Sequence, residues 1–470
     1  MKKHLLSCIA LALSLVFLFS GCSLRFTALP NLLRPPKLAG DYEGLQEAFE
    51  DSVGKNFSLK TPISGDYRSA FVMYDVDNDG EDEAFVFYTQ NKDQSTVRLH
   101  FMDSENGRWT FHYDFPGAGS DVYSVFFADM NDDGFSELIV EWNLFDSKES
   151  KVLTVYHYDH TENTPSINTL AREACTAMLP IDMDNDGCKE IFLIAPEATG
   201  TVRRTVGKLL KMTNESISVV SKVTLDPKAI NYVSLKSENL GIQYPVKIYI
   251  DANVSATSMI TEIVYWDNSA KKLIAPLFDE KKGVNLVTRR NEPIASRDIN
   301  NDAIIEIPIQ TVLPDSGYAS TDILPQDSDG AGQTDVDAAQ KLYLTKWVQF
   351  QGNGSREMKV VSYSSINYSD GYMFLYPDKW IVDEENPRVT IISNQKERRW
   401  TFFAREGGKT GEALFNILTI PTDQWAKNPN ADYTLLKENG SVVYVGRLSS
   451  AASQYGIDFD QLKSSISVIE

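Results

Sequence analysis

The sequence contains few cysteines and is short of positive charge, and both shortages narrow the range of functions. Only four cysteines occur in 470 residues, which excludes a fold held together by a disulfide framework. The 45 lysines and arginines are outnumbered by 65 aspartates and glutamates, so the formal net charge is -20. Binding of nucleic acid requires a basic surface, and this balance argues against it. Acidic surfaces instead keep exported proteins soluble and attract cations.

Familiar catalytic motifs are also lacking. The sequence has no Gly-x-Ser-x-Gly nucleophile turn and no His-Glu-x-x-His zinc motif. The glycine pairs at Gly117–Gly119 and Gly352–Gly354 lack the third glycine of a dinucleotide-binding loop. His157 and His160 would point to opposite faces of a strand, so we interpret them as surface polar residues rather than as ligands of one metal. We therefore expect that the protein is not an enzyme.

An export signal occupies the N-terminus. Lys2 and Lys3 precede an apolar run from Leu5 to Phe19, and a Ser-Gly-Cys sequence ending at Cys22 follows. The run is shorter than the roughly 20 residues that cross a bilayer, which favours a signal peptide over a membrane helix. The cysteine after small residues resembles a bacterial lipobox, although Phe19 stands where that motif usually has leucine.

The lipobox resemblance implies cleavage before Cys22 and attachment of a diacylglycerol to its sulfur. The alternative is an ordinary secretory signal that happens to contain a cysteine. With cleavage before Cys22, residues 1–21 are the signal peptide. The proline-containing stretch 22–40 is either a linker that lifts a domain off the membrane or a disordered N-terminus. Cleavage removes two lysines and no acid, so the mature charge is -20 - 2 = -22. We expect a protein anchored by lipid to the outer face of the bacterial cytoplasmic membrane.

An acidic nine-residue segment recurs along the chain. Its copies begin at Asp75, Asp129, Asp182 and Asp298, with spacings of 54, 53 and 116 residues. The last spacing is close to two periods, which indicates an intervening unit that has lost its loop. Runs of β-branched and aromatic residues flank the segments and predict strands. Four strands in about 55 residues are typical of a propeller blade, so we expect a mainly β fold, a β-propeller of about five four-stranded blades.

Domain boundaries follow from where the repeats begin and end. Before them, Leu45, Phe49 and Val53 share one helical face and Gly54 is a stop signal, so residues 41–67 are expected to hold a short helix and a lead-in. The propeller is expected at 68–366, with a long polar insertion at 314–340 in its fifth unit. A chain of this length is too long for one hydrophobic core, which predicts a further domain.

Residues 367–470 have a different pattern, which predicts a small α+β domain. Short strand-like runs, among them Val389–Ser393 and Val442–Leu448, precede a terminal helix that begins after Asp458. The run from Tyr372 to Trp380 weakly resembles the opening of PsbP-like domains, and this bears on the fold alone.

The repeated segments, named loop 1 to loop 4 in chain order, have the composition of calcium loops. Positions 1, 3, 5 and 9 of each are Asp, Asn or Glu, and position 6 is glycine in three of the four. Calcium takes about six to eight oxygen ligands, and side chains at positions 1, 3 and 5 of a tight turn converge on one point. The backbone carbonyl of position 7 adds an oxygen, and glycine at position 6 permits a left-handed backbone. The alternative is a set of metal-free acidic turns.

The spacing separates two families of calcium loop. An EF-hand loop ends with an acid at position 12 and leads into a helix. Here position 12 is Val86, Val140 or Leu193, and strand-like sequence follows. The loops instead resemble those of FG-GAP/VCBS repeats, the blades of integrin-α-type propellers, and the resemblance covers roughly residues 68–366. The whole chain resembles bacterial lipoproteins that place such repeats behind a lipobox.

By this resemblance the side-chain ligands fall on positions 1, 3, 5 and 9 of each loop, with the backbone of position 7 beside them in loops 1 to 3. These positions are Asp75, Asp77, Asp79, Glu81 and Glu83 in loop 1; Asp129, Asn131, Asp133, Phe135 and Glu137 in loop 2; Asp182, Asp184, Asp186, Cys188 and Glu190 in loop 3; and Asp298, Asn300, Asp302 and Glu306 in loop 4. Ala303 replaces the glycine in loop 4. We therefore expect three Ca²⁺ sites, with loops 1 and 3 binding best and loop 2 next, whereas loop 4 ranks last and need not bind the ion.

The expected function is that of a cell-surface binding module, stabilised by calcium, for a protein or polysaccharide ligand. The alternative is an extracellular polysaccharide-active lyase or hydrolase, because propellers with such loops occur in some lyases. A cleft lined with exposed aromatic residues and paired carboxylates would favour that alternative. In the mature chain Cys175 and Cys188 would lie roughly 20 Å apart on the expected hairpin, too far for a disulfide.

Overall fold

The computed structural model describes residues 44–105, 108–144, 147–159, 166–199, 202–213, 216–319, 336–337, 341–352 and 357–469. The predicted signal peptide, lipidated Cys22 and linker lie outside the described residues. The chain divides into two compact units, the first comprising residues up to Asp75 together with Asp79–Gly117, and the second comprising Val76–Asn78 together with the chain from Ala118 onward. In the described parts, no helix combines the length and the apolar character needed to cross a membrane.

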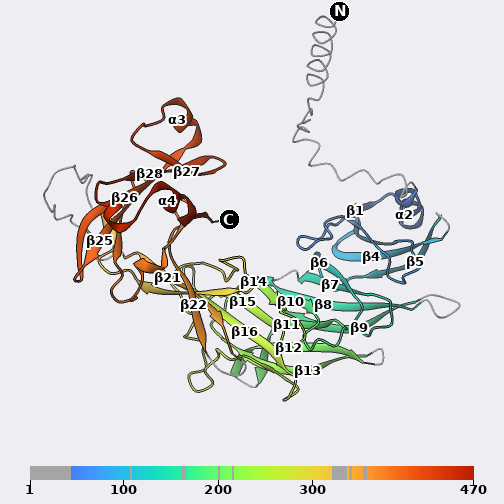
Figure 1. Ribbon diagram of the computed structural model, residues 1–470. Coiled ribbons are helices and arrows are strands. Elements are labelled where there is room, and N and C mark those ends of the chain that lie inside the picture. Colours follow the sequence, from blue (N-terminus) through green and yellow to red (C-terminus); the bar gives the residue numbers. More distant parts are fainter. Residues whose placement is uncertain are drawn as a thin grey trace, which may run out of the picture. The chain divides into compact units, whose positions relative to one another are not determined.

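Unit 1 holds a helix and one antiparallel sheet (Figure 1). Its elements are α2 (Leu45–Val53), β1 (Phe57–Leu59), β2 (Phe71–Tyr74), β3 (Glu83–Gln90), β4 (Asp93–Glu105) and β5 (Arg108–Pro116). β3 pairs with β4 on one side and with both β1 and β2 on the other. Helix α2 buries Leu45 and Phe49 against this sheet, and it ends at Gly54, whose φ of 79° lies in the left-handed region.

Three four-stranded antiparallel sheets follow in unit 2, each with its strands in chain order. The second sheet contains β6 (Asp121–Ala128), β7 (Glu137–Leu144), β8 (Ser147–Asp159) and β9 (Ser166–Cys175). The third contains β10 (Ala177–Ile181), β11 (Glu190–Thr199), β12 (Val202–Thr213) and β13 (Ser216–Leu225). The fourth contains β14 (Asn231–Glu238), β15 (Lys247–Asn253), β16 (Met259–Asp267) and β17 (Lys272–Ile274).

The fifth sheet combines strands that lie far apart in the sequence. It contains β18 (Glu306–Val312), β21 (Tyr343–Phe350), β22 (Met358–Asn367), β23 (Tyr372–Leu375) and β29 (Ile466–Val468). Antiparallel pairing of β29 with β23 brings the end of the described chain back to this sheet. The first and fifth sheets therefore have five strands where the sequence predicted four.

A sixth, seven-stranded sheet follows the order β20-β19-β24-β25-β26-β28-β27. Its strands are β20 (Val336–Asp337), β19 (Gly317–Ala319), β24 (Val389–Asn394), β25 (Arg399–Glu406), β26 (Lys409–Pro421), β28 (Val442–Leu448) and β27 (Thr434–Asn439). The helical segments in this part of the chain are η3 (Asp378–Trp380), α3 (Thr422–Lys427), η4 (Ala452–Tyr455) and α4 (Phe459–Ser465). Asp458 caps α4 by accepting the backbone N–H of Gln461.

Successive sheets of unit 2 share hydrophobic cores because the strands alternate their side chains between two faces. On β11, Ile191 and Leu193 pack into a core shared with the second sheet. Phe192 and Ile194, the residues between and after them, pack into a core shared with the fourth sheet. On β15, Ile248 faces the third sheet while Tyr249 faces the fifth. The middle sheets are therefore covered on both faces, as stacked sheets require.

Candidate metal centre

Each acidic loop occupies the same place in its sheet. Loops 1, 2 and 3 each connect the two strands of a hairpin, β2 to β3, β6 to β7 and β10 to β11. Loop 4 lies between Arg297 and Glu306, which form an isolated antiparallel bridge, and β18 begins at Glu306. The glutamate at position 9 is in every case the first residue of the second strand, and all four are fully buried: Glu83, Glu137, Glu190 and Glu306.

The four loops also share one hydrogen-bond pattern. The backbone N–H of position 6 donates to Oδ2 of the first aspartate over 3.1, 3.0, 3.1 and 2.9 Å in loops 1 to 4. The N–H of position 7 donates to Oδ1 of position 5 over 2.8, 2.9, 3.0 and 2.9 Å. These bonds hold the first and fifth side chains against the backbone of the turn, whereas the carboxylates that cluster in loops 1 and 3 are those of positions 1, 3 and 9.

Left-handed backbone occurs at two positions of each loop. Position 6 has φ of 94°, 88° and 99° at Gly80, Gly134 and Gly187, and 66° at Ala303. The predicted need for a left-handed residue there is confirmed, and Ala303 adopts it despite its Cβ. Position 4 was not anticipated, yet its φ lies between 58° and 62° in all four loops. Its residues are Asn or Asp, the non-glycine types that tolerate this conformation best.

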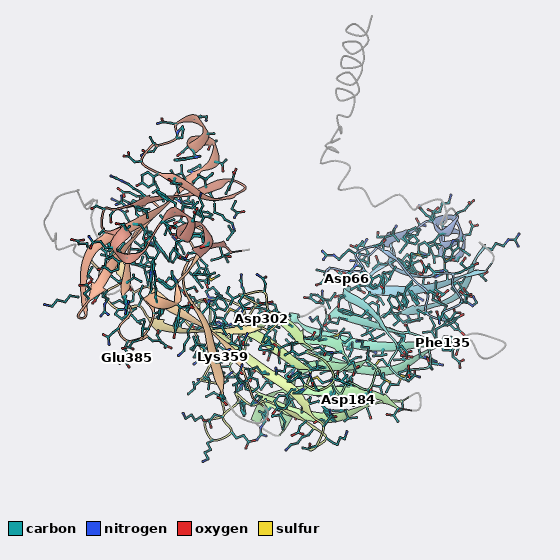
Figure 2. All side chains as sticks on the ribbon, in the orientation of Figure 1. Asp66, Phe135, Asp184, Asp302, Lys359 and Glu385 are labelled. Carbon is teal, nitrogen blue, oxygen red and sulfur yellow. The ribbon has the colours of Figure 1, made fainter. Side chains whose placement is uncertain are left out.

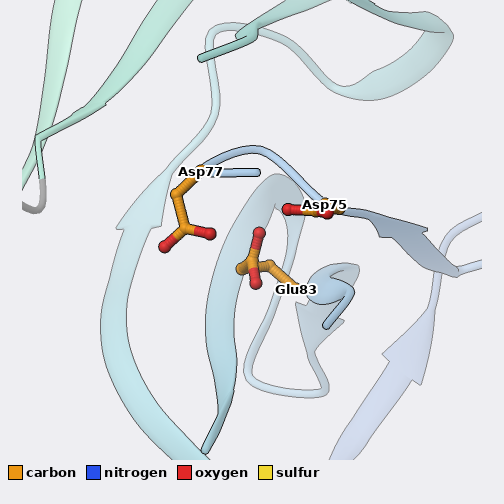
Figure 3. Close-up of side chains that lie close together, drawn as sticks. All are labelled: Asp75, Asp77 and Glu83. Carbon is orange, nitrogen blue, oxygen red and sulfur yellow. The ribbon is translucent and has the colours of Figure 1, made fainter. Parts of the chain in front are cut away.

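Loop 1 brings together carboxylates that suit a hard cation (Figure 3). Oxygens of Asp75, Asp77 and Glu83 all lie within 4.8 Å of one another. Like charges at this separation repel strongly unless a cation compensates them. The side chain of Glu81 turns away, since its Oε2 accepts the hydroxyl of Ser104 over 3.0 Å, which leaves only its backbone carbonyl for the loop. The donor set is therefore all oxygen, as calcium prefers.

Loop 3 gathers the corresponding carboxylates of Asp182, Asp184 and Glu190 within the same 4.8 Å limit. Here, however, a lysine from the third strand of the sheet enters the cluster. Lys211 Nζ lies 2.9 Å from Asp184 Oδ2 and 2.7 Å from Glu190 Oε1. It also lies 2.5 Å from Oδ2 of Asp186. An ammonium group thus already compensates part of the negative charge of loop 3.

The pKa shifts in loop 3 agree with this pairing. Burial acts to lower the pKa of Lys211, but its hydrogen bonds to the three carboxylates outweigh burial and hold that pKa above its usual value. Burial acts to raise the pKa of Asp186, and the Lys211 hydrogen bond reverses this, so the net pKa lies below the usual range. Glu190 is buried more deeply, and desolvation raises its pKa despite the same lysine.

Loops 2 and 4 each carry an asparagine at position 3, which donates to position 5. Asn131 Nδ2 lies 2.7 Å from Asp133 Oδ2, and Asn300 Nδ2 lies 3.0 Å from Asp302 Oδ2. In loop 4, Gln349 also donates to Asp302 over 2.7 Å and to the ninth-position glutamate over 2.8 Å. Neutral amides therefore meet several of the oxygens that a metal would use in these two loops.

His157 takes part in loop 2. Its Nδ1 lies 3.0 Å from Glu137 Oε1, and this hydrogen bond raises the pKa of His157 although burial opposes it. His157 is thus a partly buried polar residue that is paired with a buried carboxylate. His160, the other half of that motif, lies outside the described residues.

The comparisons with known proteins bear on these loops. Residues 56–140 match the family described as FG-GAP-like repeat. This chain contains an FG-GAP-like repeat. The matched segment includes loops 1 and 2, so the resemblance inferred from their spacing is confirmed there. A search of curated proteins finds no match.

Three solved structures are similar to this chain at low identity. Bacillus licheniformis rhamnogalacturonan lyase PL11 is 12% identical with a TM-score of 0.30, and the match covers 53% of this chain and 59% of that one. The exotype rhamnogalacturonan lyase YesX is 10% identical with a TM-score of 0.30, and 84% and 91% are covered. Sqt1 from Chaetomium thermophilum is 9% identical with a TM-score of 0.32, and 84% and 95% are covered.

The fourth sheet is the unit expected to have lost its FG-GAP-like loop. Glu238 and Lys247 pair in register at its first hairpin, as Ile181 and Glu190 do in the third sheet. A lysine thus stands where the other sheets have the ninth-position glutamate. Lys247 Nζ lies 2.5 Å from Glu238 Oε1, and both residues are buried.

All predicted ligands of loops 1 to 4 lie within the described residues. Among those residues, the acids of loops 1 and 3 form three-carboxylate clusters, and those of loops 2 and 4 do not. Cys188 offers loop 3 only its backbone, and both Cys175 and Cys188 are free thiols, as the sequence predicted. The residues that sequence reasoning missed are His157, Lys211 and Gln349, which contact the loops from neighbouring strands.

Proposed function

We propose that the protein is an exported, lipid-anchored binding module whose five consecutive sheets are blades of a calcium-stabilised β-propeller. The observation that carries this proposal is loop 1, where three carboxylates lie within 4.8 Å of one another. This loop belongs to the segment that matches an FG-GAP-like repeat. Shared cores between successive sheets of unit 2 support the assignment of the sheets as blades.

Calcium at loop 1 would be held by Asp75, Asp77, Asp79 and Glu83 with the backbone carbonyl of Glu81. Bound there, the ion supplies positive charge that offsets the repulsion among the carboxylates. Glu83 is both a ligand and the first residue of β3, so the ion ties the loop to the central strand of its sheet. The expected result is a rigid loop on a rigid framework, which is what a binding surface for a protein or polysaccharide requires.

Calcium removal tests this proposal. Extracellular calcium modules have dissociation constants of about 10⁻⁴ to 10⁻³ M. At ten times such a constant, loop 1 would add about 1.4 kcal/mol to the free energy of unfolding, a shift of a few degrees in melting temperature. We expect a chelator to lower the melting temperature of the mature protein, and we expect Asp77→Asn to reduce that effect.

Asp66→Asn is the matched control, because it removes one negative charge from an exposed residue outside the loops (Figure 2). It should leave the effect of the chelator unchanged. A melting curve that the chelator does not move would contradict calcium stabilisation.

Anchoring and ligand binding need separate tests. Replacement of Cys22 with serine should release the protein from membranes or block its processing, and normal trimming with retention on the membrane would disprove the lipid anchor. A panel of plant and cell-wall polysaccharides, scored for binding and for release of shorter products, addresses the ligand. Binding without product release supports a binding module, whereas product release would replace it with a polysaccharide-active enzyme.

A further inference from the structure

Lys211 distinguishes loop 3 from loop 1, although the two loops have identical acids at positions 1, 3, 5 and 9. Lys211 lies on β12, one residue beyond Leu210, which pairs with Ile191. This register places Lys211 beside Glu190, the ninth-position glutamate. Its ammonium contacts carboxylates from positions 3, 5 and 9, within 2.5 to 2.9 Å of each. The lysine therefore engages three of the four side chains assigned to the metal.

We propose that the ammonium group of Lys211 is the resident cation of loop 3, which holds its folded shape without calcium. Lys211 donates to Oδ2 of Asp184 and to Oε1 of Glu190, so it holds an oxygen of two of the carboxylates assigned to the metal. The second oxygen of Glu190 accepts the backbone N–H of Met183 over 2.8 Å. A divalent ion at this place would have to displace the ammonium, because two positive centres at such short range repel.

The other sheets show that this strand position decides the partner of the ninth-position glutamate. In the second sheet the glutamate meets His157, and in the fifth it meets Gln349. In the first sheet Ala84 pairs with Met102, and the next position along these antiparallel strands places Asp103 beside Glu83. Of these four positions, only the one in the third sheet carries a primary amine.

The fourth sheet supports the proposal independently. It lacks an acidic loop, and a lysine–glutamate pair occupies the hairpin instead: Lys247 and Glu238, 2.5 Å apart and both buried. The other oxygen of Glu238 accepts the backbone N–H of Ile305, which is position 8 of loop 4, over 2.9 Å. In loop 3 the N–H of position 8, Lys189, likewise reaches the preceding sheet, at the carbonyl of Asp129. An ammonium–carboxylate pair thus already replaces the metal loop at one hairpin of this chain.

The decisive experiment counts calcium ions per chain by isothermal titration of the mature protein and its variants. Lys211→Met keeps an unbranched side chain of nearly the same length and removes its charge, and we expect this variant to bind one more calcium than the wild type. Adding Asp184→Asn to it should abolish that gain. In chelator the Lys211→Met variant should melt below the wild type, and calcium should restore most of the difference. Lys208 lies on β12 like Lys211 and forms an ion pair with Glu173 of β9, so Lys208→Met is the control and should change neither result.

Two outcomes would overturn the proposal. One is a Lys211→Met variant that folds but binds no additional calcium. The other is a loss of one calcium from the wild-type protein on Asp184→Asn alone, which would show that loop 3 already binds the ion and which is measurable even if Lys211→Met does not fold. The proposal for loop 3 rests on the proposed function in one respect: it compares loop 3 with loop 1, where calcium is proposed to bind. Failure of that function appears separately, as a wild-type titration that Asp77→Asn does not alter.

Discussion

Loops 1 and 3 have the same four acids and nearly the same backbone, yet they differ in what compensates their charge. In both, three carboxylates lie within 4.8 Å of one another. The neighbouring strand brings Lys211 into loop 3 and places a further acid, Asp103, beside loop 1. The sequence of a loop therefore sets where its acids point, whereas the strand beside it determines whether they need a cation from solution.

The largest expected effect comes from breaking the internal pair of loop 3. Glu190→Gln removes the most buried of the three partners of Lys211 while Asp184 and Asp186 remain, and loss of a hydrogen bond to a charged group costs about 1.5–3 kcal/mol. We expect this destabilisation to be the same with calcium and with chelator. Glu83→Gln in loop 1 should instead destabilise the protein only when calcium is present, since it removes repulsion when calcium is absent. Urea unfolding in both conditions measures the contrast, and a calcium-dependent effect of Glu190→Gln would break it.

The second prediction concerns the pH dependence of stability, to which a buried carboxylate outside the loops contributes. Glu262 on β16 is fully buried, and desolvation raises its pKa from 4.5 to about 8. Between these values the unfolded chain has lost this proton while the folded chain keeps it, so stability falls as the pH rises. From pH 5 to pH 7 the loss from this group is about 2 kcal/mol.

Glu262→Gln should remove this contribution to the pH dependence, because glutamine does not titrate. The fold should be kept, since the amide oxygen can accept the backbone N–H of Asp226, which in the wild type donates to Glu262 Oε1 over 3.0 Å. Urea unfolding at pH 5 and pH 7 in chelator gives the comparison. An unchanged slope with pH in the variant would assign the dependence to other groups.

The smallest expected effect concerns position 6. Ala303 in loop 4 has φ of 66°, a conformation that costs a residue with a Cβ roughly 1 kcal/mol or more. Ala303→Gly should therefore stabilise the protein by about 1 kcal/mol, and Gly187→Ala in loop 3 should destabilise it by a similar amount. Melting curves of the two variants in chelator test the strain alone. Shifts of the same sign in both would contradict the shared loop geometry.

The loops and their flanking strands could be predicted because their signals are local. Nine consecutive residues contain the spacing of the acids and the turn glycine, and alternating apolar residues mark the strands on either side. The order of calcium affinity was predicted from the same local information, and it ranked loop 3 with loop 1. Lys211 is 21 residues away from Glu190, and Gln349 is 43 residues away from Glu306.

Contacts of that kind depend on strand register, which the sequence does not specify closely. The pairings that carry these two contacts, β11 with β12 and β18 with β21, are regular, whereas those of β4 with β5 and of β12 with β13 shift by one residue, and such a shift moves a side chain to the other face. Long-range pairing was missed for the same reason. The strand β29 pairs with β23 from almost a hundred residues away, and β19 pairs in parallel with β24. No local pattern marks either partner.

The most direct test of the account is a crystal of the mature protein grown in calcium, with anomalous scattering used to locate the ions. The account predicts a peak at loop 1 among the carboxylates of Asp75, Asp77 and Glu83. It predicts no peak at loop 3, where Lys211 Nζ remains within hydrogen-bonding distance of Asp184 and Glu190. A peak of equal height at loop 3, with the lysine turned out of the cluster, would contradict it.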